Sequence, residues 1–114
     1  MLIGYARVST LDQTLALQQD ALTAAGCEKI FTDKASGSQT DRPGLSDALW
    51  QLRKGDTLVV WRLDRLGRTL EHLIDTIRHL ERQGVHLKSL QEQIDTTTSG
   101  GKLVFHVFGG AGGV

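Results

Sequence analysis

The chain has 114 residues, and 13 Lys and Arg residues balance 13 Asp and Glu residues, so its formal net charge is zero. Neutrality argues against an autonomous nucleic-acid binder, and an aromatic content of 5% argues against a base-stacking platform. No stretch approaches the roughly 20 apolar residues of a membrane span. The N-terminus lacks the features of a signal peptide, and the single Cys27 suits a reducing cytoplasm, so we expect one cytoplasmic domain.

The first predicted elements are a strand and a helix. The apolar run over 2–8 indicates a buried strand. A helix is predicted over 11–25, because Thr10 and Gln13 have capping-box spacing and Gly26 is placed to end it. Its apolar face would comprise Leu11, Leu15, Leu22 and Ala25.

A second strand and helix follow. Residues 29–33 predict a short strand, and the polar stretch 34–42 indicates a loop. Pro43 fits the first turn of a helix that would stop at Gly55. The residues that this helix is expected to bury are Leu45, Ala48, Leu49 and Leu52.

The remaining pattern repeats this alternation. Residues 57–61 predict a strongly apolar strand, and a third helix is expected to run from near Thr69 to Gly84. Its apolar positions are Leu70, Leu73, Ile74, Ile77 and Leu80. Residues 85–90 predict a last strand, and 91–99 a polar loop.

The order helix, glycine, strand occurs three times and predicts an α/β fold with a mainly parallel central sheet of four to five strands flanked by helices. Ligands of such sheets gather at the carboxyl ends of the strands. Ser9, Asp33 and the segment 62–68 all come just after predicted strands. We therefore expect them to share one site.

The residue types at these positions suit chemistry on a phosphodiester. A serine hydroxyl such as Ser9 needs help to act as a nucleophile. Arginine donates paired hydrogen bonds to phosphate oxygens and stays charged. The candidate phosphate ligands are Arg7, Arg42, Arg65 and Arg68. Asp64 lies among them in the sequence, where it would orient an arginine or move a proton.

Five motifs resemble the catalytic domain of serine recombinases of the small resolvase/invertase family. They occur in family order, and they are Tyr5-Ala6-Arg7-Val8-Ser9-Thr10, Asp33-Lys34-Ala35-Ser36-Gly37, Asp41-Arg42-Pro43-Gly44, Gly55-Asp56-Thr57-Leu58-Val59-Val60 and Leu63-Asp64-Arg65-Leu66-Gly67-Arg68. The resemblance implies a resolvase-like three-layer domain and covers the chain as far as Phe108.

The resemblance also implies a mechanism. Ser9 would attack a DNA backbone phosphate and form a 5′-phosphoserine link with release of a 3′-hydroxyl. Arg7, Arg65 and Arg68 would hold that phosphate, with assistance from Arg42, and Asp64 would be the acid or base. The expected secondary site residues are Gln13, Gln18, Asp33 and Ser36. No metal or cofactor is implied.

By the same resemblance, the partner is a double-stranded recombination site, and homodimers assemble into tetramers. We expect a catalytic domain over 1–98 and the start of a shortened dimerisation helix over 99–114, with no DNA-binding domain. The glycine-rich end, 109–114, departs from the family pattern. Our hypothesis is a frameshift or an engineered truncation, which would weaken association and activity.

Other interpretations remain open at this point. The chain would be a non-catalytic remnant or interaction module if it cannot engage DNA. An unrelated nucleotide-binding domain is disfavoured, because no glycine-rich phosphate-loop motif follows the first strand. His72, His79 and His86 recur every seven residues, but seven residues of helix span about 10 Å, too far for two imidazoles to share an ion.

Overall fold

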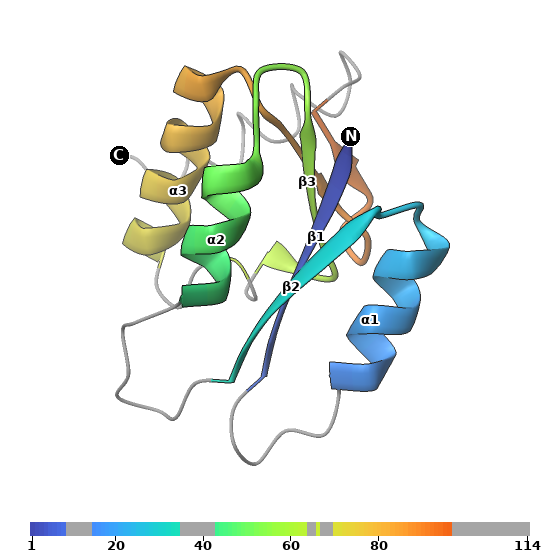
Figure 1. Ribbon diagram of the computed structural model, residues 1–114. Coiled ribbons are helices and arrows are strands. Elements are labelled where there is room, and N and C mark those ends of the chain that lie inside the picture. The colour runs from blue at the N-terminus through green and yellow to red at the C-terminus, as the bar shows by residue number, and fades with distance from the viewer. Residues whose placement is uncertain (9–14, 35–42, 64–65, 67–69, 97–114) are drawn as a thin grey trace.

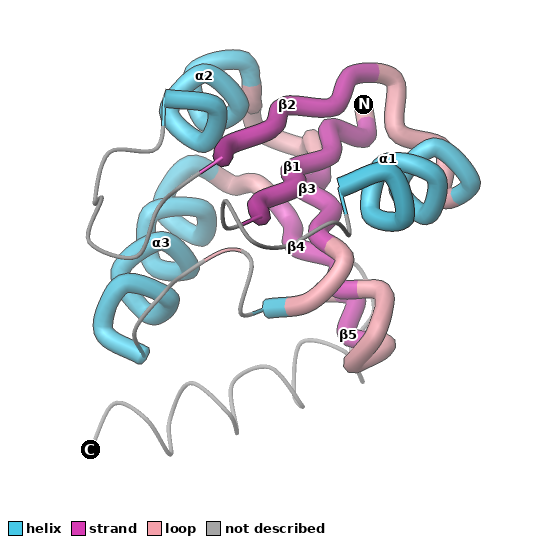
Figure 2. Tube along the Cα trace, turned by 90° about the horizontal axis from the view of Figure 1, so that it is seen from below, coloured by secondary structure: helices cyan, strands magenta, loops and turns pink. Residues whose placement is uncertain are grey.

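The computed structural model describes residues 1–8, 15–34, 43–63, 66 and 70–96, which form a three-layer α/β domain (Figure 1). The elements are β1 (Leu2–Val8), α1 (Leu15–Ala24), β2 (Lys29–Lys34), α2 (Pro43–Gln51), β3 (Thr57–Val60), α3 (Leu70–Gln83), β4 (His86–Ser89) and β5 (Ile94–Asp95). Figure 2 shows α1 on one face of the sheet and α2 and α3 on the other.

The described strands form one sheet in the order β2-β1-β3-β4-β5. All neighbouring pairs are parallel except β4 and β5, which are antiparallel. The predicted fold class, a mainly parallel sheet flanked by helices, is therefore confirmed. The strand β1 lies between β2 and β3. Because helices cover both faces of the sheet, the two faces of β1 contribute to the two halves of the core.

Side chains of β1 alternate between the two halves. Ile3 and Tyr5 belong to the larger apolar cluster, with residues of α2 and α3, whereas Ala6 belongs to the smaller cluster beside α1. Gly4 allows α1 to approach closely, since a Cβ at this position would lie 3.1 Å from Cys27 Sγ and 3.2 Å from Leu22 Cδ1. The tight packing on this face therefore depends on a missing side chain.

Each predicted glycine lies in the turn between a helix and the next strand, although α2 ends four residues before Gly55. Gly26, Gly55 and Gly84 have φ values of 97°, 93° and 72°, which glycine adopts without strain. The Gly55 N–H donates to the Gly84 carbonyl oxygen at 2.9 Å, so two of these turns support each other. The next strand follows each turn within a few residues, which keeps the connections short.

Two element boundaries differ from the sequence prediction. The second helix ends at Gln51 rather than near Gly55, although Leu52 is still buried. The expected loop over 91–99 contains β5, whose Ile94 pairs with Ser89. A two-residue strand is too short to produce a detectable periodicity. For the first helix, residues 11–14 and the Thr10–Gln13 capping box lie outside the described residues.

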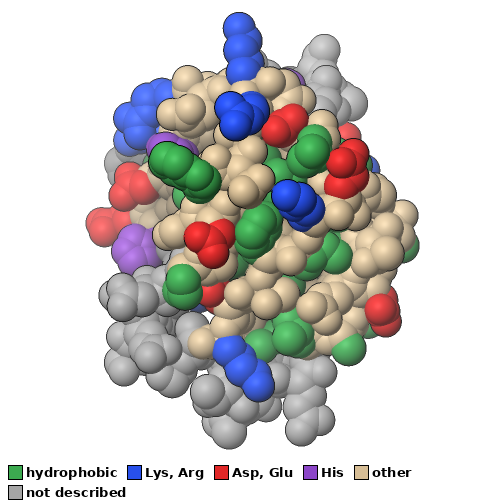
Figure 3. Space-filling view, in the orientation of Figure 1, with side chains coloured by type: hydrophobic (Ala, Val, Ile, Leu, Met, Phe, Trp, Pro, Cys, Tyr) green, Lys and Arg blue, Asp and Glu red, His purple; other side chains and the backbone are tan. Residues whose placement is uncertain are grey.

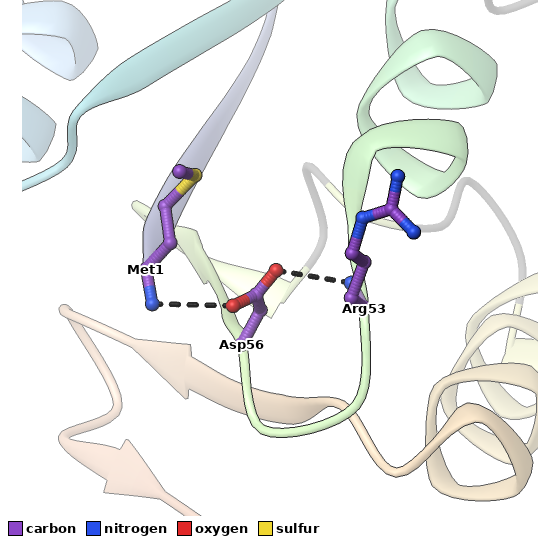
Figure 4. A network of polar contacts seen from close by, with 3 residues as sticks. All are labelled: Met1, Arg53 and Asp56. Atoms are coloured by element: carbon purple, nitrogen blue, oxygen red, sulfur yellow. Dashed lines mark hydrogen bonds and ion pairs between the residues drawn. The ribbon is translucent and has the colours of Figure 1, made fainter.

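The start of β1 is fastened to the turn before β3 (Figure 4). The Asp56 carboxylate accepts a hydrogen bond from the Arg53 backbone N–H at 3.0 Å, and it pairs with the Met1 α-amine at 3.2 Å. These contacts hold the pKa of Asp56 below its ordinary value, and the hydrogen bond from the Arg53 backbone N–H is the largest cause. None of the described helices has the length and apolar character needed to cross a membrane.

Candidate functional site

The carboxyl ends of β1, β2 and β3 lie along one edge of the sheet, because the three strands are parallel neighbours. Arg7 of β1 is in register with Asp33 of β2, and Tyr5 is in register with Val60 at the end of β3. Three predicted site residues are described: Arg7, Gln18 and Asp33. The others lie outside the described residues, and they are Ser9, Gln13, Ser36, Arg42, Asp64, Arg65 and Arg68.

Gln18 of α1 holds the main chain at the end of β1. Its side-chain Oε1 accepts from the Arg7 N–H at 3.2 Å, and its Nε2 donates to the Arg7 carbonyl oxygen at 3.1 Å. Gln18 is fully buried, and β3 pairs with β1 only as far as Tyr5. The amide therefore bonds the β1 main chain where the ladder with β3 has ended, two residues before Ser9.

Asp33 connects β1, β2 and α2. Its Oδ2 accepts from the Tyr5 hydroxyl at 2.7 Å and from the Leu45 N–H at 3.0 Å, and its Oδ1 accepts from the Gly44 N–H at 2.8 Å. The residue is 7% exposed. Its carboxylate therefore satisfies two amides in the first turn of α2, as an N-terminal cap does, from a neighbouring strand.

The chain leaving β3 is held by Glu92, a residue that the sequence pattern did not single out. The Leu63 N–H lies 3.2 and 3.3 Å from the two Glu92 carboxylate oxygens, and the Ser89 hydroxyl donates to Oε1 of the same carboxylate. Glu92 lies in a stretch predicted to be a polar loop, and no pattern in the neighbouring sequence indicates that its carboxylate bonds the Leu63 main chain. Its function depends on the pairing of β3 with β4.

The charges visible on one face of the described part of the chain do not form a single patch of one sign (Figure 3). On the face shown in Figure 3, acidic and basic side chains of the described residues are interspersed. Arg62, beyond the end of β3, places its guanidinium over the Trp61 ring at 4.9 Å from the centroid. Within the part of the chain that the structure describes, no three His, Cys, Asp or Glu residues are grouped so that they could hold a metal ion.

Comparison with known proteins identifies the family. Residues 2–112 match the model described as "Resolvase, N terminal domain". The chain belongs to the resolvase family. The parallel sheet and the order of its strands and helices are therefore those of a resolvase-family domain, in agreement with the motifs found in the sequence.

Curated relatives of this resolvase-family domain are more than half identical to it. The serine recombinase gin of Escherichia phage Mu is 58% identical over 109 residues, which are 96% of this chain and 56% of the relative. The transposon Tn552 resolvase of Staphylococcus aureus is 56% identical over 110 residues, which are 95% of this chain and 56% of the relative. The chain thus spans about half the length of these relatives.

A solved structure supports the same assignment. The N-terminal catalytic domain of TP901-1 integrase superposes with a TM-score of 0.79 at 26% identity, and the match covers 96% of this chain and 92% of that one. In the resolvase-family domain described here, Gln18, Asp33 and Glu92 each bond the main chain next to a segment that bears predicted catalytic residues. The described part of the site is a framework for those segments.

Proposed function

We propose that this resolvase-family domain cleaves and rejoins DNA at a specific site, with Ser9 as the nucleophile. The observation that carries the proposal is the match of residues 2–112 to the resolvase N-terminal domain, with relatives named as serine recombinases, DNA-invertases and resolvases. The position of Ser9, directly after the last residue of β1, supports it. Ligands of parallel α/β sheets bind at this edge.

In the proposed reaction, Ser9 Oγ forms a bond to phosphorus and the bond from phosphorus to the 3′ oxygen breaks. The serine loses its proton and the 3′ oxygen gains one, with Asp64 as the acid or base helper. Arg7, Arg65 and Arg68 would stabilise the charge on the phosphate oxygens. Rejoining reverses these steps, with a 3′-hydroxyl as the attacking group, and needs no metal or nucleotide.

The remaining site residues divide into two groups in this proposal. Gln13, Ser36 and Arg42 would act on the substrate side. We also propose that Gln18 and Asp33 position the chain, because Gln18 bonds the main chain of β1 and Asp33 bonds two amides of α2 and the Tyr5 hydroxyl. The expectation that both also bind substrate stays a prediction.

The proposal extends to the partners and the organisation of the chain. The substrate is double-stranded DNA in the cytoplasm, and the working assembly is a homodimer that forms tetramers. Residues 1–98 supply the catalytic domain, and 99–114 correspond to the start of a dimerisation helix. Relatives of similar identity are named as invertases and as a resolvase, so the proposal covers inversion and resolution alike.

A covalent-adduct assay tests the function. The chain, alone and fused to a sequence-specific DNA-binding domain, is incubated with supercoiled DNA that carries the cognate site, and the reaction is stopped with detergent. We expect protein joined to 5′ ends, and none with Ser9→Ala. Ser46→Ala is the matched control, because Ser46 is an exposed serine of α2.

The pattern of adducts separates the competing functions. If the fused protein forms adducts and the unfused chain does not, the domain is catalytic only when it is brought to DNA. The absence of adducts from both forms would contradict the proposal and favour the interaction-module alternative. Adducts that persist in Ser9→Ala would assign the chemistry to another residue.

A further inference from the structure

The carboxylate of Glu92 continues the pairing of β3 with β4 after both strands have ended. Beyond the last register pair, Val60 and Ser89, the Leu90 N–H donates to the Val60 carbonyl oxygen at 3.0 Å and the Gln91 N–H donates to that of Trp61 at 2.9 Å. The next bond in this direction runs from the Leu63 N–H to the Glu92 side chain. At Leu63, a side-chain carboxylate therefore replaces a main-chain carbonyl as the hydrogen-bond acceptor.

Leu63 is held from both sides. Its N–H is bonded by Glu92, and its carbonyl oxygen accepts from the Leu66 N–H at 3.0 Å. Leu66 is fully buried in the larger apolar cluster. Leu63 and Leu66 thus provide two fixed points in the chain, and the two residues between them in the sequence are Asp64 and Arg65.

Glu92 is an exposed residue of a short turn, and a buried serine also bonds its carboxylate. Glu92 lies in the four-residue turn that joins β4 to β5, and the following residue, Gln93, has a φ of 56°. The Ser89 side chain, which is 1% exposed, donates its hydroxyl to the Glu92 carboxylate. A hydrogen bond from a backbone N–H to a carboxylate is charge-assisted and stronger than a neutral one.

From this geometry we propose that Glu92 is a positioning residue for the Asp64–Arg65 segment: its carboxylate fixes the Leu63 main chain at the exit of β3. The inference rests on the proposed function for its catalytic consequence. The hydrogen-bond anchor stands independently of that function. In this proposal Glu92 takes no part in the chemistry, because its carboxylate is bonded to the Leu63 main chain and the Ser89 hydroxyl.

Amide hydrogen exchange tests the anchor on the 114-residue chain. We expect Glu92→Ala to speed exchange at the Leu63 N–H at least about tenfold. The Leu90 and Gln91 amides should keep their protection, because their acceptors are main-chain carbonyls. Glu92→Gln should restore protection, since its amide oxygen still accepts from Leu63. Gln91→Ala, an exposed neighbour in the same turn, is the matched control and should change nothing.

The adduct assay tests the consequence for catalysis. In the form of the protein that yields adducts, Glu92→Ala should slow adduct formation about tenfold or more at unchanged DNA affinity, and Glu92→Gln should recover most of the rate. Unchanged Leu63 exchange in Glu92→Ala, or altered exchange with an unaltered adduct rate, would overturn the inference. If wild-type protein forms no adduct while Leu63 exchange behaves as expected, the anchor is supported and the proposed function fails.

Discussion

Asp33 shows how one buried carboxylate can join two strands and a helix. The sequence places it at the end of a strand beside other polar residues, where ligands usually bind. In the structure it accepts three hydrogen bonds, from the Tyr5 hydroxyl and from two amides of α2. Because a buried donor without an acceptor is costly, this acid stabilises the two strands and the helix together.

We predict that Asp33→Ala lowers the free energy of unfolding by about 2–4 kcal/mol, because it leaves the Tyr5 hydroxyl and two helix amides without this acceptor. Tyr5→Phe removes one of the three bonds and should cost about 1 kcal/mol. Urea denaturation monitored by circular dichroism measures both. Asp47→Ala, at an exposed position of α2, is the control, and an equal loss in Asp33→Ala and Asp47→Ala would refute the capping role.

The element that depends most on a missing side chain is α2. A Cβ on Gly44 would collide with the carbonyl oxygen of Thr32 in β2 and would lie 2.9 Å from Asp33 Oδ1. The backbone of the first helical turn therefore lies directly against the strand that caps it. Any side chain at this position must move α2 away from β2 or disrupt the bonds to Asp33.

We accordingly expect Gly44→Ala to destabilise the domain by about 1–3 kcal/mol, the usual cost of overpacking, although alanine is normally favoured over glycine in a helix. Ser46 lies two residues after Gly44 and is exposed, so Ser46→Ala should change the free energy of unfolding by less than about 0.5 kcal/mol. Thermal unfolding compares the two variants. An increase in melting temperature for Gly44→Ala would mean that β2 and α2 are not in close contact.

The sequence predicted the elements whose signals are local. The helix-ending glycines at 26 and 84 and the apolar periodicity of α3 depend on neighbours in the chain, and the structure has them as expected. The two-residue β5 and the bond from Leu63 to Glu92 depend instead on the pairing of β3 with β4. No periodicity or motif encodes such contacts, so the framework of the site could not be derived from the sequence alone. The family motifs predict candidate reacting groups, but they carry no signal for the contacts of Gln18, Asp33 and Glu92.

At the scale of the whole molecule, the candidate site lies at the carboxyl ends of the parallel strands, and the start of the chain is bonded at their amino ends. The strands β1 and β3 begin where Thr57 N–H donates to the Met1 carbonyl oxygen at 3.0 Å. They run in parallel from there to the edge where Gln18 and Glu92 hold the exits of β1 and β3. Contacts at the amino ends therefore help to set the register of β1 against β3.

Asp56 makes this dependence measurable through pH. Because its pKa is lower in the folded chain than its ordinary value of 3.8, the carboxylate stabilises the fold at pH values above 3.8, and this contribution is lost as the pH falls through the lowered pKa. Water screens the pair with the Met1 amine, so we expect less than about 1 kcal/mol. Asp56→Asn should lower the melting temperature by a few degrees between pH 5 and 7, roughly the range of maximal stability.

The difference between wild type and Asp56→Asn should then shrink as both proteins are titrated below pH 3.8 and through the lowered pKa of Asp56, where the wild-type carboxyl becomes protonated. Asp75→Asn, at an exposed position of α3, serves as the control for the change in net charge. A melting-temperature difference that stays constant after the pH has fallen through the lowered pKa would show that Asp56 acts through its shape and hydrogen bonds rather than its charge. A difference that disappears on acidification for Asp56→Asn but not for Asp75→Asn would instead show that the ionised Asp56 carboxylate stabilises the fold.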